Sequence, residues 1–303
     1  VLETAGIRKF FSGPESFTPD TNTLLGEVPE IKNFFVCCGL NSIGIGSGGG
    51  VGKVTAEWLI NGHINEDIFS YDIKRFQKFH SELGFIKKRI TESLGDLYGM
   101  HWPFKQHKTS RNVKTLPHHD NLKSFGACFG VSAGYERPMW FALDGEKSEY
   151  EYSYNYQNWY PSAEYETNNT IKNVGLFDLT PFSKFEIKSD TAHQELQKIC
   201  TANIQNEPGK CVYTHMLNPD GGIETDLTVI CVEKNNFRII SSAATRERDK
   251  FHIKKYLSND IELKDITDDL CVFGLFGPKS RDLIKAISKD NFDNDNFKFG
   301  TAK

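Results

Sequence analysis

The sequence predicts an α+β protein whose chain falls into three stretches of different character. Residues 121–303 alternate short apolar segments with helical patterns, residues 68–120 are dominated by one amphipathic pattern, and residues 1–67 join a strand, a glycine cluster and a helix. Strands that return in short steps around single helices are typical of α+β domains. With 303 residues, the chain has room for about two domains.

The first stretch centres on a glycine cluster that follows a predicted strand over residues 33–38. A helix is predicted over residues 51–60, and Asn61-Gly62 is a common signal for its end. Residues 44–49 fit the G-x-G-x-x-G spacing of dinucleotide-binding turns, but five residues separate the strand from the first glycine. A long helix rather than a second strand is predicted next, and the phosphate-binding G-x-x-x-x-G-K-[ST] pattern is not met either.

The glycine cluster leaves two interpretations open. Glycines let a flat ligand approach the backbone closely, and the start of the following helix offers unpaired N–H groups and the positive end of its dipole. Such a site suits a partial negative charge, as on the pyrimidine oxygen of a flavin ring. The alternative is a tight strand-to-helix turn that binds nothing.

The second stretch carries apolar residues at three- and four-residue steps from Ile73 to Leu97. This periodicity predicts one long helix that packs one face on a core. Lysine and arginine side chains on the opposite face predict a solvated surface, formed by Lys74, Lys78, Lys87, Lys88 and Arg89.

The third stretch contains the elements of the predicted α+β domain, joined by a turn at residues 218–222 that has the sequence Asn-Pro-Asp-Gly-Gly. Strands are predicted at residues 185–188, 212–217, 227–232, 237–243 and 270–276. Helices are predicted at residues 190–200, 247–257 and 279–287.

Composition argues against several classes of protein. The 36 basic and 40 acidic residues give a net charge of −4, which is not the basic footprint of a nucleic-acid-binding protein. No apolar run approaches the ~18–20 residues of a membrane helix. The seven cysteines form no C-x-x-C pair and predict reduced structural thiols. His118-His119-Asp120 has no further ligand at suitable spacing and predicts a solvated loop rather than a metal site.

Several motifs, in order along the chain, resemble the dimethylglycine and sarcosine dehydrogenase family. The motifs similar to the end of the flavin domain of these enzymes are residues 13–20, 25–29 and 33–42. Residues 72–76 and 102–103 are similar to their small central domain. The motifs that resemble the start of their folate-binding domain, which is shared with the aminomethyltransferase of the glycine cleavage system, are residues 125–127, 135–141 and 175–182.

The resemblance implies a division of the chain into three parts. Residues 1–67 would be the C-terminal part of a flavin-binding amine-oxidase-type domain, residues 68–120 the small central domain, and residues 121–303 the N-terminal part of an aminomethyltransferase-like folate-binding domain. The chain starts at Val1 and ends at Lys303, inside the family's pattern, so we expect an internal fragment that is inactive alone. The flavin-linking histidine and most of the amine pocket would precede it.

The activity implied by the resemblance has two stages. FAD would oxidise an N-methyl group of dimethylglycine or sarcosine, and tetrahydrofolate would capture the one-carbon unit at a distant site. The backbone of Ile43, Gly44, Ile45 and Gly46 would face the flavin ring, and Gly49 and Gly50 would open the helix beneath it; Tyr213 and Asp226 would contact folate. Asp226 is the catalytic candidate, because a carboxylate can stabilise positive charge and shuttle a proton during attack on an iminium.

Partners and compartment also follow from the resemblance and the thiols. The substrate would be a small N-methyl amine and the electron acceptor an electron-transfer flavoprotein, with no role for nucleic acid or a membrane. The compartment would be the cytoplasm of a bacterium or the mitochondrial matrix of a eukaryote.

The alternative interpretations give these residues a structural role or the chain a role without oxidation. Asp226 could cap a hairpin at the end of a turn, and Tyr213 could be a core aromatic. The whole chain could belong to a folate-binding aminomethyltransferase-like or regulatory protein without oxidase activity, or to a non-catalytic binding module. A nicotinamide dehydrogenase is disfavoured by the spacing of the glycines, and the choice between dimethylglycine and sarcosine stays open.

Overall fold

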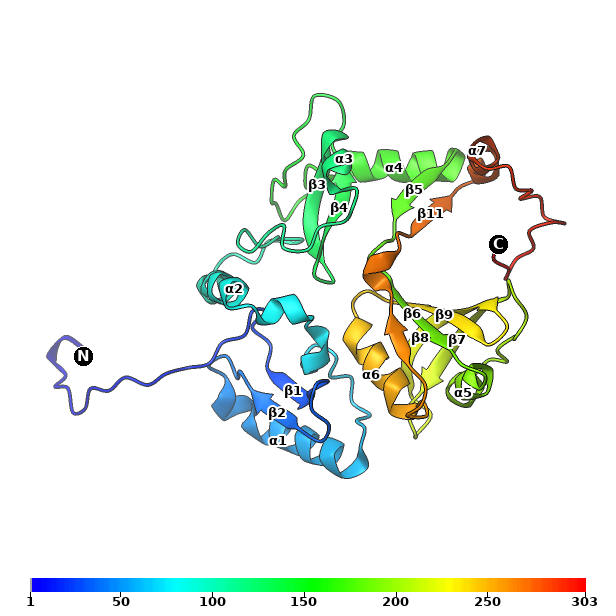
Figure 1. Ribbon diagram of the computed structural model, residues 1–303. Helices are drawn as coiled ribbons and strands as arrows, with labels where there is room; N and C mark the ends of the chain where they lie inside the picture. The colour runs from blue at the N-terminus through cyan, green and yellow to red at the C-terminus, as the bar shows by residue number, and fades with distance from the viewer. Residues whose placement is uncertain (1) are drawn as a thin grey trace.

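The computed structural model describes residues 2–303 and shows an α+β chain (Figure 1). A strand–helix unit and a helical central segment form one side, and a five-stranded sheet with its helices forms the other. Two further two-stranded sheets, one of them a hairpin, lie beyond them. Within residues 2–303, no helix combines the length and the apolar character needed to cross a membrane.

The strand–helix unit follows a short 3-10 helix, η1 (Leu2–Thr4), and consists of β1 (Leu24–Glu27), β2 (Phe35–Cys38) and α1 (Gly44–Asn61). β1 and β2 are antiparallel, with Leu24 opposite Cys38. The ring of Trp58 packs edge-on to Phe35 at 6.0 Å and is buried on the inner face of α1.

The helix of this unit begins seven residues earlier than the sequence predicts, so the prediction that Gly49 and Gly50 open it is wrong. Glycines have low helix propensity, which is why the pattern placed the start at Val51. Local contacts outweigh that cost: the N–H of Ser47 donates to the carbonyl of Ile43, and Leu40 packs directly beneath Gly44. The predicted end is confirmed, because Gly62 adopts a left-handed conformation after Asn61.

The central segment is not the single long helix that the periodicity predicts. It contains two short 3-10 helices, η2 (Ile73–Arg75) and η3 (Lys78–Ser81), before α2 (Leu83–Asp96). The backbone is extended at Phe76, Gln77 and Glu82, where each short helix begins or ends. Successive 3-10 turns also repeat every three residues, so apolar spacing alone could not separate them from an α-helix.

The third stretch is built on a five-stranded antiparallel sheet in the order β10-β6-β9-β8-β7. The strands are β6 (Ser183–Lys188), β7 (Cys211–Leu217), β8 (Ile223–Glu233), β9 (Asn236–Ser241) and β10 (Leu263–Asp265). Two helices, α5 (Ala192–Ile199) and α6 (Arg246–Tyr256), pack on one face of this sheet and complete the apolar core. The predicted strands, helices and the 218–222 turn in this region are confirmed, with ends shifted by a few residues.

The remaining elements lie outside the five-stranded sheet. They are α3 (His119–Ser124), β3 (Ala127–Ser132), β4 (Tyr135–Phe141), α4 (Tyr160–Lys172), β5 (Gly175–Asp178), η4 (Thr267–Asp269), β11 (Phe273–Phe276) and α7 (Ser280–Ile287). β3 pairs with β4, and β5 pairs with β11. The predicted loop at His118-His119-Asp120 is wrong in part, because α3 starts at His119.

Candidate functional site

The two predicted folate residues meet on an exposed face of the five-stranded sheet. β7 and β8 are antiparallel, with Tyr213 opposite Thr228 and His215 opposite Asp226. Because side chains alternate along a strand, the neighbours of these residues point into the core, whereas Tyr213, His215 and Asp226 share the other face. The hydroxyl of Tyr213 donates a hydrogen bond to Oδ2 of Asp226 at 3.0 Å.

The exposure of Tyr213 and its hydrogen bond to Asp226 are both compatible with a ligand-binding surface. The side chain of Tyr213 is 62% exposed, so its interpretation as a core aromatic is wrong. The hydrogen bond to the Asp226 carboxylate raises the pKa of the Tyr213 phenol, so the phenol keeps its proton and remains a donor. Asp226 does not cap the turn either, since the Asn218 carboxamide accepts the N–H groups of Asp220 and Gly222.

Sequence reasoning missed His215. Its ring lies edge-on to Tyr213, with 5.4 Å between ring centroids and an interplanar angle of 73°. Two-residue alternation from Tyr213 along a predicted strand is the signal that could have found it.

The strand that carries Asp226 is in contact with α6. Nη2 of Arg248 donates to Oε2 of Glu224 at 2.7 Å, two residues before Asp226. Asp249 is 1% exposed, and its Oδ2 accepts the hydroxyl of Thr245 at 2.7 Å. Burial raises the pKa of Asp249 to about 6. The Arg248–Glu224 contact ties β8 to α6, whereas the Thr245–Asp249 hydrogen bond lies within the first turn of α6.

The predicted flavin-facing residues lie at the start of α1. Gly44, Ile45 and Gly46 form its first turn after Ile43, and within residues 2–303 no backbone acceptor is found for their N–H groups, as expected for a helix start. Gly46, Gly49 and Gly50 face open space, where an added Cβ would meet, apart from the adjacent residues and the nearby backbone of α1, no atom of the described chain within 4 Å. This turn and the Tyr213–Asp226 pair lie in separate parts of the chain (Figure 1).

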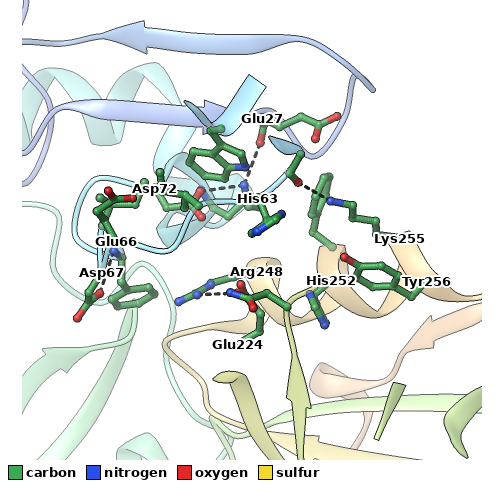
Figure 2. A pocket seen from close by; sticks show the side chains of 18 residues that line it. Glu27, His63, Glu66, Asp67, Asp72, Glu224, Arg248, His252, Lys255 and Tyr256 are labelled. Carbon is green, nitrogen blue, oxygen red and sulfur yellow. Dashed lines mark hydrogen bonds and ion pairs between the residues drawn. The ribbon is translucent and has the colours of Figure 1, made fainter. Parts of the chain in front are cut away.

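A small cavity of about 80 Å³ lies between the strand–helix unit with its following segment and the sheet domain. Figure 2 shows Glu27, His63 and Asp72 on one side and Arg248 and Lys255 of α6 on the other. The contacts across it join the strand–helix unit to the sheet domain.

The seven cysteines are free thiols, and those at positions 37, 38 and 271 are exposed. Among residues 2–303, no cluster of three or more His, Cys, Asp or Glu side chains could hold a metal ion.

Two family models match successive parts of the chain. The FAD dependent oxidoreductase central domain matches residues 61–115, and the GCVT N-terminal domain matches residues 118–303, which is more than half of the chain. Relatives that align with essentially the whole chain include sarcosine and dimethylglycine dehydrogenases. The chain belongs to the dimethylglycine and sarcosine dehydrogenase family.

Three relatives illustrate how the family varies. A 4-methylaminobutanoate oxidase (formaldehyde-forming) from Paenarthrobacter nicotinovorans is 38% identical over 97% of this chain and 36% of its own length. The mitochondrial pyruvate dehydrogenase phosphatase regulatory subunit of Mus musculus is 32% identical over 98% of this chain and 34% of its own. The mitochondrial sarcosine dehydrogenase of Homo sapiens is 31% identical over the whole chain and 38% of its own length. The chain thus spans about a third of these relatives.

Proposed function

We propose that the chain is part of a flavin-dependent dehydrogenase that oxidises an N-methyl amine and passes the one-carbon unit to tetrahydrofolate. The observation that carries this proposal is the Tyr213–Asp226 pair on an open sheet face, in a domain of the aminomethyltransferase type. The division into residues 1–67, 68–120 and 121–303 is part of the proposal.

The Tyr213–Asp226 pair has the chemistry that a folate step requires. A secondary amine nitrogen that attacks an electrophilic carbon becomes positively charged and must then lose a proton. Tyr213 already donates to Oδ2 of Asp226, so Oδ1 remains available to face the ligand and accept that proton. The same carboxylate stabilises the positive charge before the proton leaves. His215 adds a third polar ring to the surface, beside Tyr213.

The start of α1 has the shape that a flavin ring requires. The backbone there bears side chains only at Ile45 and Ser47 among residues 44–50, and the space beside Gly46, Gly49 and Gly50 is open. The N–H groups of Gly44, Ile45 and Gly46 would donate to the ring's pyrimidine edge. When bound, flavin supplies the acceptor for a hydride from the N-methyl carbon.

Substrate, electron acceptor and compartment are parts of the same proposal. The relatives act on 4-methylaminobutanoate and on sarcosine by name, so an N-methylated amino acid is the substrate class we propose. An electron-transfer flavoprotein would reoxidise the flavin. The mitochondrial relatives support a matrix location in a eukaryote, and the cytoplasm is the corresponding bacterial compartment.

The direct test uses a protein of the relatives' length that contains this chain. Anaerobic addition of sarcosine, dimethylglycine or 4-methylaminobutanoate should bleach its flavin bands with one preferred amine. Tetrahydrofolate should then convert released formaldehyde into methylenetetrahydrofolate. A colourless protein, or bands indifferent to all three amines, would refute the oxidative half of the proposal.

A second candidate is a folate-binding regulatory protein without oxidase activity. The observation that favours it is the similarity to a phosphatase regulatory subunit, which is 32% identical in an alignment that covers 98% of this chain. The same spectrum separates the two, because a regulatory protein would bind tetrahydrofolate without any amine-dependent bleaching.

A further inference from the structure

Lys74 is a buried lysine at the junction of all three parts of the chain. It lies in η2 and is only 4% exposed. Its ammonium group lies 3.0 Å from Oδ1 of Asp72 and donates to the carbonyl of Glu27 at 3.2 Å. Burial of an ammonium group is unfavourable unless it is paired, so these partners explain why Lys74 can occupy this position.

Two aromatic rings from different parts of the chain flank this ammonium group. It lies 4.8 Å from the ring of Trp58 on α1 and 4.9 Å from the ring of Phe251 on α6. Both distances are within the range of cation–π attraction, which is stronger when the cation is desolvated. Lys74 therefore joins the strand–helix unit and the sheet domain through one group. α6 and η2 are in contact along this junction.

A second set of contacts holds the neighbouring turn. Nε2 of His63 and Nδ2 of Asn65 each lie 2.8 Å from Oδ2 of Asp220, in the turn between β7 and β8. Nζ of Lys255 donates to the carbonyl of Gly62 at 2.6 Å. Figure 2 shows His63 and Lys255 on facing sides of this junction. The β7–β8 pair that carries Tyr213 and Asp226 is thus anchored at its turn and by the contact of Arg248 on α6 with Glu224 on β8.

We propose that Lys74 is a positioning residue that fixes the folate-binding part on the strand–helix unit, so that one-carbon units released at one site are captured at the other. This inference rests on the proposed function and adds a role for a side chain that touches neither site. Its consequence is a coupling of two reactions: loss of Lys74 should leave each half-reaction intact and impair the transfer between them.

The test uses Lys74→Met, which keeps the aliphatic stem and removes the charge. Because that variant leaves the Asp72 carboxylate buried without its cation, the double variant Asp72→Asn, Lys74→Met is made as well. The carboxamide introduced by Asp72→Asn can still accept the backbone N–H of residue 74, as the Asp72 carboxylate does at 2.9 Å. Lys254→Met, on an exposed position of α6, is the matched control.

Hydrogen exchange reports on docking without any cofactor or substrate. Amides of residues 61–67, 218 and 220–222 should exchange about tenfold faster in both Lys74 variants than in the wild type, whereas those of β6 and β9 should not change. In the protein of the relatives' length, the share of the one-carbon unit recovered on tetrahydrofolate rather than as free formaldehyde should fall about tenfold. Flavin bleaching by the amine and the affinity for tetrahydrofolate should keep their wild-type values.

The outcomes are distinct. Unchanged exchange and unchanged partition in the double variant would overturn the inference, and so would a parallel loss of bleaching and folate affinity, which indicates general unfolding. If the wild type shows no bleaching, the proposed function fails, and exchange alone decides whether Lys74 docks the two parts.

Discussion

Glu136 lies in the fork of the Arg111 guanidinium, with Oε1 2.7 Å from Nε and Oε2 2.6 Å from Nη2. Arg111 lies in the central segment after α2 and Glu136 lies in β4, so this bidentate pair ties the loop after α2 to the β3–β4 hairpin. Glu136 is 1% exposed and also accepts the N–H of Asn112. Burial alone would raise the pKa of Glu136, but the hydrogen bonds from Arg111 and Asn112 outweigh it and lower the pKa.

Arg111→Met should destabilise the chain strongly because it leaves a buried carboxylate without its cation. Breaking a buried ion pair from one side costs about 3–5 kcal/mol. A lowered pKa in the folded state means that the stabilisation is present above the unfolded pKa of about 4.3 and is lost as the pH falls through the folded value. Urea unfolding is measured from pH 7 to pH 3. The difference in free energy of unfolding between wild type and variant should become smaller as the pH falls. A difference that is constant with pH would contradict this.

Asp249→Asn should change the pH dependence of stability in the opposite sense. Burial raises the pKa of Asp249 to about 6, so the folded state holds a proton that the unfolded state releases near pH 4. The contribution of Asp249 to the free energy of unfolding is largest below about pH 4. It decreases by about 3 kcal/mol in all as the pH rises to about 6. The variant should lack that decrease, as measured by urea unfolding at pH 4 and pH 7. The exposed Asp260→Asn should behave as wild type.

The sequence predicted the sheet domain well because its signals are local. Two-residue alternation and turn residues place β7, β8 and the 218–222 turn, and the same alternation puts Tyr213 and Asp226 on one face. Their 3.0 Å hydrogen bond depends on the register in which β7 pairs with β8. The positions of the strands in the sequence do not determine that register.

Elsewhere, long-range contacts decided the outcome. The first turns of α1 consist mainly of glycines, and beyond the local contact of Leu40 the helix is in contact with β1 and β2. Lys74 was assigned to a solvated face, yet it is buried by Trp58 and Phe251, which lie far from it in the sequence. A charge stripe predicts exposure only when no partner approaches from another part of the chain.

Gly26→Ala and Gly52→Ala should have opposite effects on stability. Gly26 has φ of +107°, and an added Cβ would lie 2.6 Å from the buried ring of Trp58, so we expect a loss of about 1–3 kcal/mol. Gly52 lies inside α1 with open space around it, so alanine there should stabilise by about 0.5–1 kcal/mol. Thermal unfolding of both variants measures the difference. A neutral Gly26→Ala would mean that Trp58 can move.

Asp226→Asn and Tyr213→Phe should separate the two halves of the proposed reaction. Asparagine cannot accept a proton, so transfer of the one-carbon unit to tetrahydrofolate should slow by about 10²–10⁴-fold. Phenylalanine leaves the Asp226 carboxylate in place but removes the 3.0 Å hydrogen bond that orients it, so the loss should be smaller, about tenfold. Amine-dependent bleaching of the flavin should be unchanged in both, because neither residue lies at the start of α1. Rapid-mixing absorbance and methylenetetrahydrofolate yield, measured on one preparation, check both steps. Equal losses in both steps would show that the variants disturb the fold rather than the proton transfer at Asp226.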